Sequence, residues 1–208
     1  MSMARRRVAI LISGRGSNMT ALIEAARDPG YPAEIVLVIS NRPDAAGLAY
    51  AKKSGISTAV IDHKVFKTRE HFDAAIEEML VQAGVEIICL AGFMRMLTTP
   101  FVKRWRGRML NIHPSLLPAF KGLDTHARAL AAGANAHGCT VHFVAPELDS
   151  GPIVLQAEVP VLEGDDEESL AARVLAEEHR IYPAALKLLA EGKLKIDGER
   201  VVVLGGPQ

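Results

Sequence analysis

The chain has 208 residues, which is enough for one well-filled hydrophobic core, and we expect one compact domain. Lysine plus arginine number 24 and aspartate plus glutamate also number 24, so no net charge attracts the chain to nucleic acid or to a membrane surface. The composition therefore predicts small-molecule substrates, with no nucleic-acid partner and no membrane partner. It leaves open whether the chain is a monomer or a homodimer.

Short apolar runs alternate with longer amphipathic stretches in the first half of the chain. The pattern predicts strands at residues 8–13, 34–40, 57–61 and 87–91. It predicts helices at residues 18–27, 44–54 and 69–84. Because strands and helices that alternate are typical of a doubly wound, mostly parallel sheet, we predict a Rossmann-like α/β fold with flanking helices.

The pattern changes after one more predicted strand, at residues 109–112. Residues 139–144 and 153–161 are rich in β-forming side chains, with a loop and no helical pattern between them. Such a pair predicts an antiparallel C-terminal extension of the sheet.

The last segment predicts one long helix, at residues 167–189, with leucines and alanines three and four positions apart. Pro183 should break or kink this helix. Residues 199–204 predict a final edge strand. Since neither a repeat nor a linker interrupts the sequence, residues 1–208 are expected to form a single domain.

The two cysteines, Cys89 and Cys139, lie inside apolar runs without Cys-x-x-Cys spacing, so we expect free thiols in a reducing compartment. The 7 histidines show no paired ligand spacing, which argues against a bound metal. Residues 8–12 are too short an apolar run to span a membrane, and a glycine-rich loop follows where a signal peptide would have its cleavage region. We therefore expect a soluble, cytoplasmic protein without a metal.

Three polar residues stand out as candidates for catalysis. Asn111 and His113 occupy alternate positions at the end of a predicted strand, so both can face one site, and Pro114 ends the strand. An amide and an imidazole can together stabilise an oxyanion, while a carboxylate such as Asp149 can orient the imidazole and favour its charged form. The combination is typical of acyl or formyl transfer. A purely structural role for polar groups in loops is the alternative.

A glycine-rich loop, Ser-Gly-Arg-Gly-Ser-Asn at residues 13–18, lies between the first strand and the first helix. Glycines let backbone N–H groups approach an anion, and a helix N-terminus adds partial positive charge, so the loop predicts a phosphate site. A dinucleotide-binding motif would need another glycine where Met19 stands and an acid after the second strand. The alternative is a simple turn in which Ser17 or Asn18 caps the helix.

Residues 111–115 and 147–152, together with 91–97 and 137–144, resemble the signature of the folate-dependent formyltransferase family. The similarity extends from about residue 8 to about residue 195, and it is strongest to the members that act in purine synthesis. It implies transfer of a formyl group from 10-formyltetrahydrofolate, as co-substrate, to the amine of a phosphorylated glycinamide riboside. The amine would attack directly, without a metal or a covalent enzyme intermediate.

The resemblance also assigns roles to individual positions. The catalytic residues would be Asn111, His113 and Asp149. The contacts to the ribonucleotide would be Arg15, Gly16, Ser17, Asn18 and Glu178. The contacts to folate would be Arg69, Phe93, Met94, Arg95, Met96, Leu97, His142, Ala145, Pro146, Glu147 and Leu148.

Two of these assignments depend on the resemblance alone, because Arg69 and Glu178 would otherwise be interpreted as solvated groups on helices. Arg15 occupies a position that is often asparagine in relatives, so its role is open. The implied roles divide the chain into a phosphate-binding half, about residues 1–105, and a catalytic and folate-binding half, about residues 106–208.

Three other functions share part of this pattern. Formylation of initiator methionyl-tRNA would use the same three catalytic residues, but we expect it to need a further C-terminal domain and a basic surface. A formyltetrahydrofolate hydrolase would be expected to carry a regulatory domain before the first strand. A nucleotide-binding dehydrogenase module is favoured only by the glycine loop, and the missing glycine and acid count against it.

Overall fold

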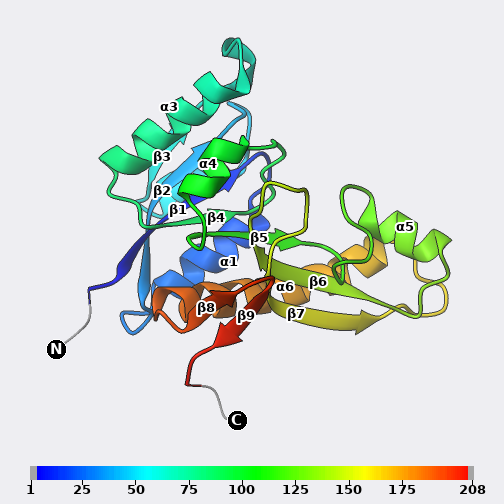
Figure 1. The fold of residues 1–208 in the computed structure, drawn as a ribbon. Helices are drawn as coiled ribbons and strands as arrows, with labels where there is room; N and C mark the ends of the chain where they lie inside the picture. The colour runs from blue at the N-terminus through cyan, green and yellow to red at the C-terminus, as the bar shows by residue number, and fades with distance from the viewer. Residues whose placement is uncertain (1–3, 206–208) are drawn as a thin grey trace.

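The computed structural model describes residues 4–205. Within this range the strands form one seven-stranded sheet, in the order β3-β2-β1-β4-β5-β6-β7, and one two-stranded sheet (Figure 1). The strands of the large sheet are β1 (Arg6–Ile12), β2 (Ala33–Ser40), β3 (Ser57–Val60), β4 (Ile87–Leu90), β5 (Met109–His113), β6 (Ala136–Phe143) and β7 (Ile153–Pro160). The small sheet pairs β8 (Leu194–Asp197) with β9 (Arg200–Val203).

Helices cover both faces of the large sheet. They are α1 (Ser17–Ala26), α2 (Gly47–Lys53), α3 (Arg69–Gln82), α4 (Thr99–Arg104), α5 (Thr125–Ala131) and α6 (Glu167–Ala190), with a short 3₁₀ helix η1 (His63–Val65). Buried apolar side chains of α1, α2 and α6 pack on one face of the sheet, and those of α3 and α4 pack on the other (Figure 1). The two apolar clusters make the predicted three-layer α/β arrangement, which confirms the fold class.

The order of the strands reverses between β1 and β4. Strands β1 to β5 run parallel, while β6 and β7 are antiparallel to their neighbours. In an open α/β sheet a ligand binds where the order reverses, outside the carboxyl ends of the strands. The loops that follow β1, β4 and β5 therefore meet at the edge where a site is expected.

The last predicted strand is present as β9. It pairs with β8, which was not predicted, across a two-residue turn in which Gly198 has a φ of +61°. Pro183 does not break the helix α6, which runs over 24 residues. Apolar residues on both sides of the proline, such as Val174 and Leu186, are buried against the sheet, and this packing maintains the helix.

The remaining differences are small. The short helices α4 and α5 were not predicted, whereas the predicted strands and long helices lie within a few residues of their observed positions. None of the helices in the described range is both long and apolar enough to cross a membrane.

Candidate active site

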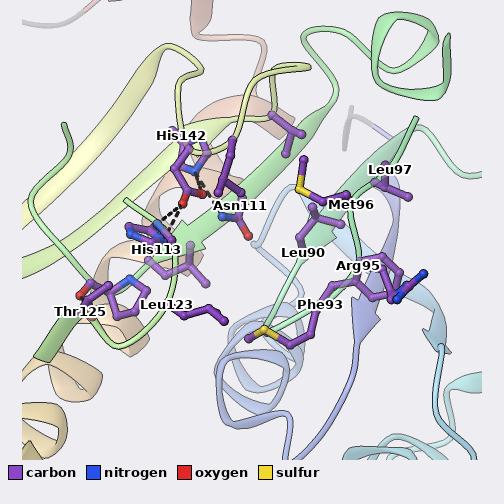
Figure 2. Close-up of a pocket in the computed structure, with 18 of the residues that line it drawn as sticks. Leu90, Phe93, Arg95, Met96, Leu97, Asn111, His113, Leu123, Thr125 and His142 are labelled. Carbon is purple, nitrogen blue, oxygen red and sulfur yellow. Dashed lines mark hydrogen bonds and ion pairs between the residues drawn. The ribbon is translucent and has the colours of Figure 1, made fainter. Parts of the chain in front are cut away.

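The end of β5 presents two polar side chains to one side of the sheet. Leu110 and Ile112 belong to the apolar cluster on the face covered by α6, so Asn111 and His113, at the alternate positions, point to the opposite face. Both line a cavity of about 570 Å³ at the edge of the sheet (Figure 2). The alternation predicted from the sequence thus holds in the structure.

The ring of His113 lies between two acceptors. Its Nδ1 is 3.4 Å from Oδ2 of Asp149, and its Nε2 is 3.0 Å from the carbonyl oxygen of Phe120. A neutral imidazole carries only one N–H, whereas the charged ring can donate to both acceptors. Because the side chains of His113 and Asp149 are only 7% and 9% exposed, water competes little with the contact between the ring and the carboxylate.

The backbone places Asp149 where it meets His113. Asp149 lies in the loop between β6 and β7 and has a φ of +47°, a conformation that aspartate and asparagine adopt more readily than most residues. Its Oδ2 also accepts a hydrogen bond of 2.9 Å from the N–H of Gly122. The loop after β5 therefore holds both the carboxylate, through Gly122, and the histidine, through Phe120.

His142 fixes the orientation of Asn111. The two residues are paired in register across β5 and β6, and Nδ2 of Asn111 lies 3.2 Å from Nε2 of His142. The Nδ1 of His142 is 2.9 Å from the carbonyl oxygen of Phe143, which can only accept, so the proton lies on Nδ1 and Nε2 accepts from the amide. Burial lowers the pKa of His142 and keeps the ring neutral. The second N–H of Asn111 remains for a substrate oxygen.

Most of the predicted folate contacts line the same cavity. They are Phe93, Met94, Arg95, Met96, Leu97, His142, Ala145, Pro146, Glu147 and Leu148. Figure 2 shows Phe93, Met96 and Leu97 across the cavity from Asn111 and His113. Arg69 lies outside the lining of the cavity, at the exposed start of α3. The structure thus brings together all of these predicted positions except Arg69.

The predicted ribonucleotide contacts lie at the carboxyl end of β1, which β4 separates from β5 in the sheet. Gly16 has a φ of +73° and stands directly before α1, which begins at Ser17. A Cβ atom at Gly16 would come within 3.0 Å of Met19 Cε and 3.3 Å of Gly47 Cα, so the loop needs glycine here. Arg15, next to it, is exposed.

Glu178 meets this loop from α6 instead of facing solvent. Its Oε2 accepts a hydrogen bond of 2.8 Å from Nδ2 of Asn18, and the residue is only 6% exposed. Burial raises the pKa of Glu178, while the bond from Asn18 opposes that shift. Oδ1 of Asn18 is buried without a protein partner in residues 4–205. The expectation that Glu178 lies at the phosphate loop is consistent with this arrangement.

Several residues near the cluster were not predicted from the sequence. Phe120 and Gly122 contact His113 and Asp149 through backbone atoms, and Thr125 and His126 line the cavity. Backbone contacts depend on the path of the loop and leave no signature in residue type. The link between His142 and Asn111 could have been found from the strand register.

Among the described residues, no three histidine, cysteine, aspartate or glutamate side chains lie close enough together to hold a metal ion.

Comparison with known proteins identifies the class. Residues 6–186 match the family model described as formyl transferase. The phosphoribosylglycinamide formyltransferase of Escherichia coli is 43% identical over 201 residues, which cover 93% of this chain and 95% of that protein. The structure of glycinamide ribonucleotide transformylase 1 from Symbiobacterium toebii matches with a TM-score of 0.94 and 49% identity, over 96% of this chain and 94% of the other.

A longer relative is also similar. The trifunctional purine biosynthetic protein adenosine-3 of Bos taurus is 54% identical over 192 residues, which cover 92% of this chain but only 19% of that protein. The chain thus spans between 14% and 19% of the length of the trifunctional relatives that it matches. It belongs to the formyl transferase family and, within that family, to the phosphoribosylglycinamide formyltransferases, as the sequence resemblance predicted.

Proposed function

We propose that this chain transfers the formyl group of 10-formyltetrahydrofolate to the amine of 5'-phosphoribosylglycinamide, as a step of de novo purine synthesis. One observation carries the proposal: an oriented amide and an imidazole–carboxylate pair meet at the end of β5, on the wall of a cavity. The similar proteins of Escherichia coli and Haemophilus influenzae bear the name of this activity.

The cavity suits a folate. Its volume of about 570 Å³ is typical of sites for ligands of drug size, and its lining combines apolar side chains with backbone polar groups. Phe93, Met96 and Leu97 offer an apolar surface to a flat heterocycle, and residues 145–149, which line the same cavity, would supply backbone N–H and C=O groups to its polar edge. Arg69 stays a predicted contact to a more distant part of the same molecule.

The glycine loop suits the phosphate of the other substrate. Backbone N–H groups at residues 16–18 open the helix α1, where the partial positive charge of the helix favours an anion. Glu178 and Asn18 lie beside them and offer acceptors to the hydroxyls of a ribose. Arg15, on the exposed side of the loop, adds a positive charge near the phosphate.

Transfer forms a bond between the amine nitrogen and the formyl carbon, breaks the bond from that carbon to the folate nitrogen, and moves one proton from the amine to the folate side. Asn111 donates its second N–H to the formyl oxygen as negative charge develops there. His113 stabilises the same oxygen as the charged ring, and we expect its Nε2 to exchange the Phe120 carbonyl for that oxygen.

Asp149 has two roles in this scheme. Its carboxylate stabilises the charge on His113 through the 3.4 Å contact with Nδ1, and it orients the ring. It can also accept a hydrogen bond from a water molecule that takes the proton lost by the amine. All of these groups belong to the protein, so the proposal includes no metal.

The other expectations from the sequence stay predictions. These are a single formyltransferase domain with a phosphate-binding half and a catalytic half, a cytoplasmic location, no nucleic-acid or membrane partner, and a monomeric or homodimeric state.

A thermal melting experiment tests the class of ligand. A ligand that binds only the folded chain raises the melting temperature, and the rise grows with the ratio of its free concentration to its Kd. We expect tetrahydrofolate and 5'-phosphoribosylglycinamide each to raise it, and NAD to leave it unchanged. A shift with NAD and none with the folate would instead favour a dinucleotide-binding function.

A further inference from the structure

Ser13 connects the phosphate loop to the wall of the folate cavity. It follows the last residue of β1 and opens the glycine loop. Its backbone N–H donates to the carbonyl oxygen of Gly92 at 3.1 Å, and its Oγ accepts from the N–H of Met94 at 2.8 Å. Both bonds hold the turn that follows β4. This turn leads into residues 93–97, which form one wall of the cavity and are called the wall below.

Asn41 fixes the direction of the Ser13 hydroxyl. Oγ of Ser13 donates its single hydrogen to Oδ1 of Asn41 at 2.5 Å, so a lone pair remains for the N–H of Met94. Nδ1 of His63 lies 3.0 Å from the backbone carbonyl oxygen of Asn41 and 3.1 Å from its Nδ2, so His63 holds Asn41 beside Ser13. Ser13 and Asn41 are only 5% and 2% exposed, so water competes little for these bonds.

The wall itself has few other supports. Met94 is 64% exposed and Met96 is 45% exposed, so their side chains do not anchor the segment by packing. Of the wall residues, Leu97 is buried and Phe93 stacks on Phe72 of α3 at a centroid distance of 6.5 Å. The backbone of Met94 therefore depends on Ser13 for its position.

We propose that Ser13, oriented by Asn41, is a positioning residue that sets the folate-binding wall. This inference rests on the function proposed above. A preformed wall lowers the entropic cost of binding a flat ligand, so the loss of the Ser13 hydroxyl weakens folate binding. The phosphate loop has its own anchor, a bond of 3.1 Å from the N–H of Gly47 to the carbonyl oxygen of Gly14, so ribonucleotide binding does not depend on that hydroxyl.

The test compares two ligands in the Ser13→Ala variant. We expect the Kd of tetrahydrofolate, measured by titration calorimetry, to rise about tenfold, the effect of leaving one backbone N–H unpaired. The Kd of 5'-phosphoribosylglycinamide should stay within about twofold of the parent value. Hydrogen exchange of the Met94 amide, followed by NMR, should also become about tenfold faster.

Matched variants separate positioning from a general loss of stability. Ser13→Thr keeps Oγ and should keep folate affinity near the parent value. Ser40→Ala is the control, since Ser40 is fully buried and, within the described residues, its hydroxyl bonds only to the backbone of Arg42. It should leave the affinity for both ligands unchanged. If Ser13→Ala does not fold, Asn41→Ala takes its place: Oγ still accepts from Met94 but loses its fixed direction, so the same ligand should be affected, with a smaller rise in the Kd of tetrahydrofolate.

Two results would overturn the inference: tetrahydrofolate affinity within about twofold of the parent value, or an equal loss of affinity for both ligands. Failure of the proposed function looks different. In that case the parent chain binds no tetrahydrofolate at all, while Met94 exchange in the Ser13 variant still reports whether the hydrogen bond holds the wall.

Discussion

Oδ2 of Asp149 lies 3.4 Å from Nδ1 of His113, although the two residues belong to different segments of the chain. His113 ends β5, and Asp149 lies in the loop between β6 and β7 with a φ of +47°. Only asparagine would keep both the shape of the side chain and this backbone conformation at low cost. The Asp149→Asn substitution therefore removes the negative charge at this contact and changes little else.

The Asp149→Asn variant should fold normally and lose turnover by about 10²- to 10⁴-fold, the range typical of a group that supports acid–base chemistry. The amide can still accept from the N–H of Gly122, but it no longer stabilises a charged His113. KM for both substrates should change much less than kcat. Steady-state kinetics beside a melting curve tests this, and turnover within a few-fold of the parent would remove Asp149 from the catalytic group.

Asn111→Ala should lower kcat by about 10²- to 10³-fold, the effect of removing one oxyanion donor. Substrate binding should change little, because the wall of the cavity stays in place. Asn135→Ala is a suitable control, since Asn135 is exposed and lies outside the cavity lining. Comparable kinetics in the two variants would show that the amide of Asn111 does not act in the reaction.

Gly16→Val should raise KM for the ribonucleotide at least about tenfold, because a side chain would contact Met19 and block the approach of an anion. Folate affinity should stay nearly unchanged. Gly55→Val is the matched control: Gly55 has a similar φ of +77°, but a Cβ atom there meets nothing within 4 Å. Both variants should lose stability through backbone strain, so a ribonucleotide defect in the control as well would contradict the assignment of the loop.

His137 should make the folded chain sensitive to acid. The ring is buried, and neither of its nitrogens has a hydrogen-bond partner among residues 4–205. Burial, and secondly the nearby His126, lowers the pKa of His137 from 6.5 to about 4. Between these values the unfolded chain binds a proton that the folded chain does not, so the free energy of unfolding decreases as the pH falls from about 6.5 to about 4.

The contribution of one such group is at most about 1.4 kcal/mol per pH unit. In His137→Gln this part of the pH dependence should be absent, while His71→Gln, at an exposed position, should keep it. Urea unfolding at several pH values measures the slope. An unchanged slope in the His137 variant would show that another group causes the acid sensitivity.

The sequence predicted the central features of the site because they depend on local patterns. Alternation along one strand places Asn111 and His113 together whatever the neighbouring strand is. The glycine loop requires only a strand, a turn and a helix in succession. Asp149 was singled out for its chemistry, and the family resemblance supported it, but its contact with His113 joins two segments that the local pattern of the chain does not bring together.

Other features could not be read from residue type. The partner of Asn111 depends on the register of β5 against β6, which sets His142 opposite it. Phe120 contacts His113 through its carbonyl group and has a φ of +51°, a conformation rare for an aromatic residue and without a sequence signature. The helices α4 and α5 have only 6 and 7 residues, too few to show a helical period.

The most direct test of the account is a complete product balance. The purified chain is incubated with 10-formyltetrahydrofolate, with and without 5'-phosphoribosylglycinamide, and N-formyl product, tetrahydrofolate and formate are measured together. We expect equal amounts of N-formyl product and tetrahydrofolate, formed only when the amine is present, and strongly reduced amounts with Asn111→Ala. Formate and tetrahydrofolate released without the amine would show a hydrolase instead, and an unchanged folate would contradict the account altogether.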